Sequence, residues 1–202
     1  VCIGKATKIC ELLTDKTKEY EAVMLLGRTT DTQDVTGETL TQQEVRCSAK
    51  EVEKAVLSFA GDYMQVPPMY SAISQNGVRL YKLARQGIEV ERESRTVNIS
   101  SISLVGCNEK NGEYTISVEC SAGTYIRSLV ADIGEKLGCG AVMTALRRTK
   151  ANGFPIDGCI TLDELAELAQ SGKIEEKIIP IEQALDSYRF VTVTEPQARR
   201  FK

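Results

Sequence analysis

The sequence predicts an α+β fold built around a mixed, mostly antiparallel sheet with flanking helices. Hydrophobic residues make up 42% of the 202 residues, which is enough to bury a core and excludes an intrinsically disordered chain. Apolar residues alternate along several segments, as they do in half-buried strands, and an Asn-Gly turn joins two of these segments as a hairpin. Between the alternating segments, apolar residues recur at helical spacing behind capping residues.

The first half of the chain predicts a strand, a helix and an extended segment. Residues 18–27 alternate, and one face of this strand carries Tyr20, Ala22, Met24 and Leu26. Residues 48–60 form a helix, because Ser48 and Glu51 make a capping box and Gly61 follows the last turn. Residues 65–71 are extended, since each of the two prolines disfavours the helical conformation of the residue before it.

The middle of the chain predicts a hairpin beside a short helix. Asn76-Gly77 is a tight turn, and residues 79–86 form a short helix that ends at Gly87. Residues 96–105 form a strand whose apolar phase shifts partway along, which indicates a bulge. A turn at Asn111-Gly112 leads into the alternating strand 113–120.

The last third predicts two helices and a final strand. Thr124 is the expected N-cap of a helix that ends at Gly138, and an apolar stretch over 141–146 follows it. Thr161 and Glu164 cap a helix over 161–170. Residues 188–194 resemble a last strand, before a Glu-Pro pair typical of a helix start.

Composition excludes several classes of function. The net charge of −3 excludes binding of nucleic acid by bulk positive charge, although a local basic groove is still compatible with it. The chain has no His, which excludes Ser-His-Asp and Cys-His catalysis and any metal site that needs His. Seven Cys without a C-x-x-C pair indicate reduced thiols in a cytoplasmic protein, and we expect no metal site. No apolar run has the length of a membrane span, so we expect no membrane contact.

One candidate site lies where a strand enters a glycine turn and opens a helix, at residues 121–127. Backbone N–H groups at a helix start favour an anion. Arg127 lies in the first helical turn, where a cation is unfavourable against the helix dipole. A carboxylate should therefore compensate Arg127, either in an ordinary salt bridge or in a catalytic pair.

A second candidate combines Tyr20 with the polar loop 29–37. Tyr20 shares its face with core residues, so a core tyrosine is one interpretation. Asp31 and Asp34 fit loop caps through Asx turns, the common role of aspartate in loops. The alternative is that the ring and a carboxylate together face a ligand.

Basic and aromatic side chains are interleaved over residues 69–87. This pattern suits a phosphate backbone with exposed bases, and equally a solvated helix face. The candidate RNA contacts here are Arg79, Lys82 and Arg85. Weaker candidates of the same kind are Arg92, Arg95, Arg147, Arg148 and Lys150.

At these segments the sequence resembles the TruB family of tRNA pseudouridine synthases. The motifs cover nearly the whole chain: G-x-A-T-K at 4–8, K-x-Y at 18–20, L-G-x-x-T-D-T-x-D-x-x-G at 26–37, P-x-M-Y-S-A at 67–72, L-Y-x-x-A-R-x-G at 80–87, C-S-x-G-T-Y-I-R at 120–127, G-x-x-L-G-x-G-A at 134–141 and L-R-R at 146–148. The resemblance implies a pseudouridine synthase fold and the isomerisation of uridine-55 in the T-arm of tRNA. It implies no metal and no redox cofactor.

The resemblance also implies roles for individual residues. Tyr20 matches the tyrosine that stacks on the flipped uracil and is a proposed proton acceptor. Tyr125 and Leu146 match residues that line the uracil pocket, and Arg127 matches the arginine that pairs with the catalytic aspartate. Lys8 and Asp34 match polar residues near the cleft.

The sequence departs from the family pattern at both ends. The nucleophilic aspartate of the family lies in a G-T-L-D-P-x-A-T-G-type loop before the G-x-A-T-K segment, and Val1 falls after that loop. We therefore expect residues 1–186 to be a partial catalytic domain. Residues 187–202 would begin a C-terminal extension, which in many members is a PUA-type RNA-binding domain.

Two function classes follow from this reading. The first is a tRNA pseudouridine synthase, an isomerase, whose 202 residues alone are inactive because the nucleophile is absent. The second is a non-catalytic RNA-binding or tRNA-folding module. Both predict the T-arm stem-loop of tRNA as partner, a cytoplasmic location, and a monomer without a protein partner when full length. A globular domain without an RNA role would leave the motifs unexplained.

Overall fold

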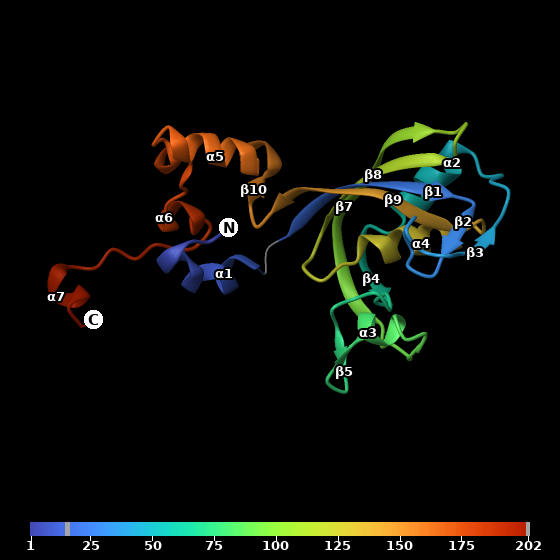
Figure 1. The fold of residues 1–202 in the computed structure, drawn as a ribbon, viewed down its shortest axis with the longest axis horizontal. Coiled ribbons are helices and arrows are strands. Elements are labelled where there is room, and N and C mark those ends of the chain that lie inside the picture. Colours follow the sequence, from blue (N-terminus) through green and yellow to red (C-terminus); the bar gives the residue numbers. More distant parts are fainter. Residues whose placement is uncertain (15–16, 201–202) are drawn as a thin grey trace. The chain divides into compact units, whose positions relative to one another are not determined.

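The structure is a computed structural model that describes residues 1–14 and 17–200. The chain divides into two compact units, and Figure 1 shows its course through both. The sheet unit runs from Asp15 to Gly158, and the terminal unit combines Val1–Thr14 with Cys159–Lys202. Among the described residues, no helix is long and apolar enough to span a bilayer.

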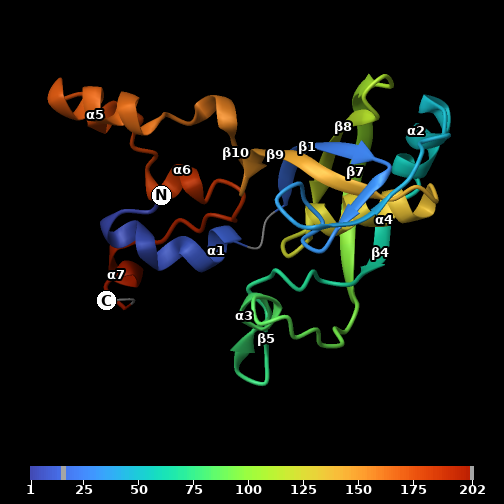
Figure 2. The same ribbon diagram turned by 45° about the vertical axis from the view of Figure 1, so that its right-hand side comes forward.

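A six-stranded antiparallel sheet forms the centre of the sheet unit (Figures 1 and 2). Its strands follow the order β10-β9-β1-β8-β7-β4. Their bounds are β1 Lys18–Leu26, β4 Gly61–Gln65, β7 Arg95–Asn108, β8 Glu113–Cys120, β9 Ala141–Ala151 and β10 Phe154–Pro155. The predicted α+β class, with a mainly antiparallel sheet, is therefore confirmed.

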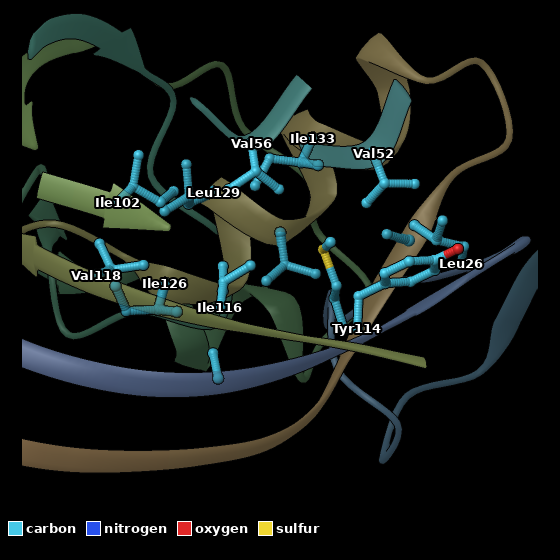
Figure 3. Packing of buried hydrophobic residues seen from close by; sticks show 14 of the residues in the cluster. Leu26, Val52, Val56, Ile102, Tyr114, Ile116, Val118, Ile126, Leu129 and Ile133 are labelled. Carbon is cyan, nitrogen blue, oxygen red and sulfur yellow. The ribbon is translucent and has the colours of Figure 1, made fainter. Parts of the chain in front are cut away.

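The core lies between this sheet and two helices, α2 (Ala49–Leu57) and α4 (Ile126–Lys136). The predicted alternation holds, because Ala22 and Met24 of β1 and Ile116 of β8 are fully buried. Figure 3 shows side chains of both helices on the same side of the strands, meeting those of β8. Burial of this shared apolar surface is the main stabilising contribution to the unit.

The sequence prediction of a bulge in β7 is confirmed. The register of β7 against β8 shifts between Ile99 and Ser101, and again between Leu104 and Gly106. The Asn111-Gly112 turn joins the two strands, as predicted. The capping box of Ser48 and Glu51 at the start of α2 is also present.

Smaller elements branch from the sheet. Strand β2 (Arg28–Thr30) pairs with β3 (Thr39–Gln42), and the loop between them carries Asp31 and Asp34. The Asn76-Gly77 turn joins β5 (Ser74–Gln75) to β6 (Val78–Arg79), and α3 (Leu80–Ala84) follows. Figures 1 and 2 both show this segment extending beyond the ends of β4 and β7.

The terminal unit consists of short helices: η1 Gly4–Ile9, α1 Cys10–Thr14, α5 Leu162–Gln170, η3 Ile174–Lys177, α6 Ile181–Ala184 and α7 Glu195–Ala198. The short helix η2 (Ile156–Gly158) closes the sheet unit. The capping box of Thr161 and Glu164 is confirmed. The prediction of a strand over residues 188–194 is wrong, because the structure assigns no strand to this segment, and Phe190 and Val191 are exposed. A strand needs a neighbour for its backbone hydrogen bonds, and residue types that favour strands do not supply one.

The predicted ends of three helices also need correction. Helix α2 ends at Leu57, three residues before the predicted end, and α3 spans Leu80–Ala84 rather than residues 79–86. The N-cap of α4 is Tyr125 and not Thr124, whose hydroxyl instead donates to the carbonyl of Ser121 at 3.0 Å. Tyr125 makes no side-chain cap. Its amide and carbonyl are hydrogen-bonded to the side chain of Gln65 in β4.

Candidate active site

The loop between β2 and β3 is folded around the carboxylate of Asp34. Oδ1 of Asp34 accepts hydrogen bonds from the Thr32 hydroxyl at 2.8 Å, the Thr36 amide at 3.0 Å and the Thr36 hydroxyl at 2.5 Å. The loop is tied to β9, because the Val35 amide donates to the Met143 carbonyl at 3.1 Å. The Asx-turn role predicted for Asp34 is thus present, and Oδ2 is left for another partner.

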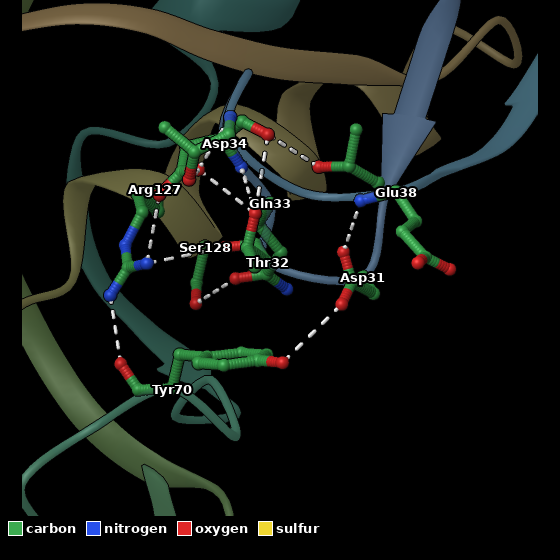
Figure 4. A network of polar contacts seen from close by, with 10 residues as sticks. Asp31, Thr32, Gln33, Asp34, Glu38, Tyr70, Arg127 and Ser128 are labelled. Carbon is green, nitrogen blue, oxygen red and sulfur yellow. Dashed lines mark hydrogen bonds and ion pairs between the residues drawn. The ribbon is translucent and has the colours of Figure 1, made fainter. Parts of the chain in front are cut away.

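That partner is Arg127, in the first turn of α4. Its Nη1 lies 3.0 Å from Oδ2 of Asp34, and the two side chains are 23% and 18% exposed. Nη1 also donates to the carbonyl of Thr32 at 3.3 Å, and Nη2 to the carbonyl of Tyr70 at 2.8 Å. Figure 4 shows the guanidinium between the loop and the Tyr70 segment. The anion that the position of Arg127 demanded is therefore Asp34.

The cluster is completed by contacts on both sides of Arg127. The Ser128 hydroxyl donates to Oε1 of Gln33 at 2.9 Å, which ties α4 to the loop a second time. Asp31 accepts from the amide of Glu38 at 2.7 Å and from the hydroxyl of Tyr70 at 3.5 Å. Three segments far apart in the sequence thus meet at one ion pair (Figure 4).

Hydrogen bonding determines the charge state of Asp34. Burial alone would raise the pKa of this carboxyl, but the bonds from Thr36, Thr32 and Arg127 outweigh burial and hold its pKa below the usual aspartate value. Asp34 is therefore ionised at neutral pH. A guanidinium carries five N–H protons, and these contacts use three of Arg127. Within the described part of the chain, two N–H protons remain, the number that a second carboxylate accepts in a bidentate pair.

Tyr20, Leu146 and Arg148 lie on one face of the sheet. In the pairing of β1 with β9, Tyr20 is opposite Arg148 and Ala22 is opposite Leu146. Residues opposite each other in antiparallel strands share a face, so these side chains lie on the side of the sheet that carries the helices. Arg147 is opposite Glu21 and lies on the other face. The two arginines of the L-R-R motif are thus separated.

The hydroxyl of Tyr20 is protonated at neutral pH. Burial raises its pKa, the neighbouring Cys120 adds to the rise, and the Arg148 guanidinium opposes it through a hydrogen bond. A neutral phenol with its ring half-buried at the edge of the core offers a flat apolar face and one polar group. Leu146, at the same edge, is 46% exposed.

Tyr125 is held by two residues that sequence reasoning did not place in the site. Gln65 contacts its peptide groups and Arg95 lies over its ring. The sequence predicts Arg95 only as a weak phosphate contact. An isolated glutamine at the end of a short polar strand gives no signal in a sequence.

The remaining predicted residues are distributed over the molecule. Arg79, Lys82 and Arg85 are exposed on and beside α3, and Arg85 lies over the ring of Tyr81 at 5.4 Å. The guanidinium of Arg79 donates to the carbonyl of Ala72. Lys8 is exposed in η1 and belongs to the terminal unit.

Comparison with known protein families gives two matches. Residues 1–126 match the model described as TruB family pseudouridylate synthase (N terminal domain). Residues 127–186 match the model described as tRNA pseudouridylate synthase B C-terminal domain.

Curated relatives agree with the family models. The tRNA pseudouridine synthase B of Alkaliphilus oremlandii is 48% identical over 185 residues, which cover 92% of this chain and 60% of that protein. The protein of the same name from Bacillus subtilis is 47% identical over 191 residues, covering 92% of this chain and 62% of that protein. The chain thus spans about three fifths of the length of these relatives.

Solved structures show the same fold. The structure titled "Crystal Structure of a Cbf5-Nop10-Gar1 Complex" matches with a TM-score of 0.67 and 27% identity, over 91% of this chain and 47% of that chain. The structure titled "Structure of H/ACA RNP bound to a substrate RNA containing 2'-deoxyuridine" matches with a TM-score of 0.63 and 24% identity, covering 91% and 46% of the two chains.

Proposed function

Because this chain belongs to the TruB family of pseudouridylate synthases, we propose that it forms part of a tRNA pseudouridine synthase that isomerises uridine-55 of the T-arm to pseudouridine. Residues 1–186 would belong to the catalytic domain and residues 187–202 to the start of a C-terminal extension. A tRNA substrate implies a cytoplasmic location. The relatives named tRNA pseudouridine synthase B support this activity.

The observation that carries the proposal is the arrangement around Arg127. Among the described residues, Asp34 and two carbonyls fix its guanidinium with three hydrogen bonds, which leaves two N–H protons for a further acceptor. A nucleophilic carboxylate has to stay ionised, and a guanidinium beside it lowers its pKa. Arg127 is thus set to receive the catalytic aspartate that the family carries in its G-T-L-D-P-type loop.

The reaction replaces a C–N glycosidic bond by a C–C bond, so the base must be detached, turned and rejoined within one pocket. The target uridine first has to leave its stack, which costs a few kcal/mol. Stacking of the base on the face of Tyr20 would offset part of this, by roughly 1–3 kcal/mol. Tyr125 and Leu146 would confine the base while it turns. The cationic side chains beside α3, with Arg148, would contact RNA phosphates.

A pseudouridine assay on an unmodified T-arm stem-loop tests the proposal. It compares the polypeptide of these 202 residues with the protein that the complete reading frame encodes. We expect turnover by the complete protein and none by the 202 residues, which lack the G-T-L-D-P-type loop. Turnover by the shorter polypeptide would disprove its inactivity. Salt-dependent binding without turnover by either would favour the non-catalytic RNA-binding module.

A further inference from the structure

Tyr125 lies at the junction of a glycine turn and helix α4. Its carbonyl accepts the first hydrogen bond of the helix, from the Leu129 amide at 3.1 Å, but among the described residues its own amide has no backbone acceptor. Its φ of −97° and ψ of 109° are extended, and as N-cap it makes no side-chain cap. The residues before it, over 121–124, form a turn. A residue in such a place keeps one orientation only if other groups hold it.

Gln65 holds the peptide groups of Tyr125. Oε1 of Gln65 accepts from the Tyr125 amide at 2.8 Å, and Nε2 donates to the Tyr125 carbonyl at 3.0 Å. Nε2 also donates to the hydroxyl of Tyr63, two residues earlier in β4. Gln65 is fully buried, so these bonds have no competition from water. Loss of its amide would leave both backbone groups of Tyr125 without this partner.

Arg95 holds the ring of the same residue. Its Cζ lies 5.2 Å from the centroid of the Tyr125 ring, and its Nη2 donates to the Gly123 carbonyl at 2.8 Å. The hydrogen bond anchors the guanidinium to the turn that precedes Tyr125. A guanidinium fixed over the face of an aromatic ring restricts the tilt of that ring.

Gln65 and Arg95 are directly opposite each other in the pairing of β4 with β7. We propose that this cross-strand pair positions Tyr125, with Gln65 fixing its backbone and Arg95 fixing its ring, and so gives the uracil pocket its shape before RNA binds. The inference rests on the proposed function, since it takes Tyr125 as a wall of that pocket. Both are positioning residues, because they act through Tyr125.

The first part of the test needs no RNA. The seven tyrosines are labelled as 3-fluorotyrosine, and the ¹⁹F resonance of Tyr125 is identified with a Tyr125→Phe variant. We expect Arg95→Met to shift and broaden this resonance. Arg85→Met is the matched control, because Arg85 lies over Tyr81 in the same way. It should move the Tyr81 resonance and leave that of Tyr125 in place.

The second part of the test measures how strongly the protein prefers a target uridine over an abasic nucleotide. Binding at one fixed salt concentration is compared for a T-arm stem-loop with uridine at the target position and one with an abasic nucleotide there. We expect the preference of Arg95→Met for uridine to be about fivefold weaker than that of the wild type, from loss of the ring contact. Loss of a phosphate contact would weaken binding of both RNAs equally. Arg85→Met should therefore keep the wild-type preference.

The outcomes distinguish failure of this inference from failure of the proposed function. A Tyr125 resonance and a uridine preference that both stay unchanged in Arg95→Met would overturn the inference, as would a shifted resonance with unchanged preference. Gln65→Met, where it folds, should give the same two changes as Arg95→Met. A wild type without any uridine preference would contradict the proposed pocket itself, and the resonance alone would then decide whether the pair positions Tyr125.

Discussion

Asp34 is the residue on which the described part of the site depends. Its carboxylate holds the loop together and pairs with Arg127 at 3.0 Å. We expect Asp34→Asn to lower the free energy of unfolding by about 1–3 kcal/mol at pH 7, since a hydrogen-bonded, half-buried cation loses its charged partner. Urea unfolding of the variant and the wild type measures the difference.

The pH dependence of this effect follows from the pKa of Asp34, which folding lowers from 3.8. The folded state therefore binds this proton less readily than the unfolded chain. The stabilisation by Asp34 is complete above the unfolded pKa and is lost as the pH falls through the folded pKa. The difference in the free energy of unfolding between wild type and Asp34→Asn should be smaller at pH 3 than at pH 7. An equal difference at pH 3 and pH 7 would show that the variant is destabilised by the changed hydrogen-bonding geometry of Asn and not by the loss of charge.

Asp132 in α4 should behave in the opposite way. Burial, and then the charge of Glu135, raise its pKa to about 6. The folded state keeps the proton up to that pH, while the unfolded chain releases it near 4, so ionisation destabilises the fold. We expect Asp132→Asn to stabilise the protein by about 1–3 kcal/mol at pH 7.5. The gain should vanish near pH 4, where the wild-type carboxyl is protonated in the folded state. Equal stabilities at pH 7.5 would contradict the raised pKa.

At the scale of the element, Gly134 sets how closely α4 approaches the start of β9. A Cβ at Gly134 would lie 2.2 Å from the Ala141 amide nitrogen and 2.4 Å from the carbonyl carbon of Gly140. These are backbone atoms and cannot turn away. We expect Gly134→Ala to lower the free energy of unfolding by about 3 kcal/mol or more, measured in urea. The matched control is Glu135→Ala, one residue later and exposed, which should stay within about 0.5 kcal/mol.

Elements with a strong hydrophobic periodicity or a capping motif could be predicted from the sequence. Elements that depend on pairing with a segment distant in the sequence could not. The alternation in β1 and β8 and the capping boxes of α2 and α5 are local signals, and all four are present. Strand β4 was not predicted as a strand, because its identity comes from pairing with β7. Residues 188–194 are rich in aromatic and β-branched residues that favour strands, yet the structure assigns no strand to them.

The same distinction holds for the site. The position of Arg127 at a helix start predicts an anion, because the helix dipole is a local property. That the anion is Asp34, 93 residues away, depends on how the loop is tied to β9. The contact of Gln65 with Tyr125 could not be predicted from the sequence for a similar reason, because the two residues are 60 positions apart. Residue types and their local setting can be predicted, whereas contacts between distant segments require the fold.

At the scale of the whole molecule, the buried core is concentrated in one unit. Every residue of the core cluster lies within Asp15–Gly158, as do Asp34, Arg127 and Tyr125. Among the described residues of the terminal unit, Leu13 is the one buried apolar side chain, whereas Leu162, Phe190 and Val191 are largely exposed. Since burial of apolar surface is the dominant favourable term in folding, the two units should contribute very unequally to stability.

We therefore expect a polypeptide of residues 15–158 to fold without the rest of the chain. It keeps the six-stranded sheet, α2, α4 and the pair of Arg127 with Asp34. Its unfolding in urea, followed by far-UV and near-UV circular dichroism, should be one cooperative transition with a midpoint close to that of the sheet unit in the 202-residue chain. Retained far-UV signal without near-UV signal would describe a compact state with loose packing. In that case the segments 1–14 and 159–202 would supply packing that the sheet unit needs, and the site around Arg127 would depend on them.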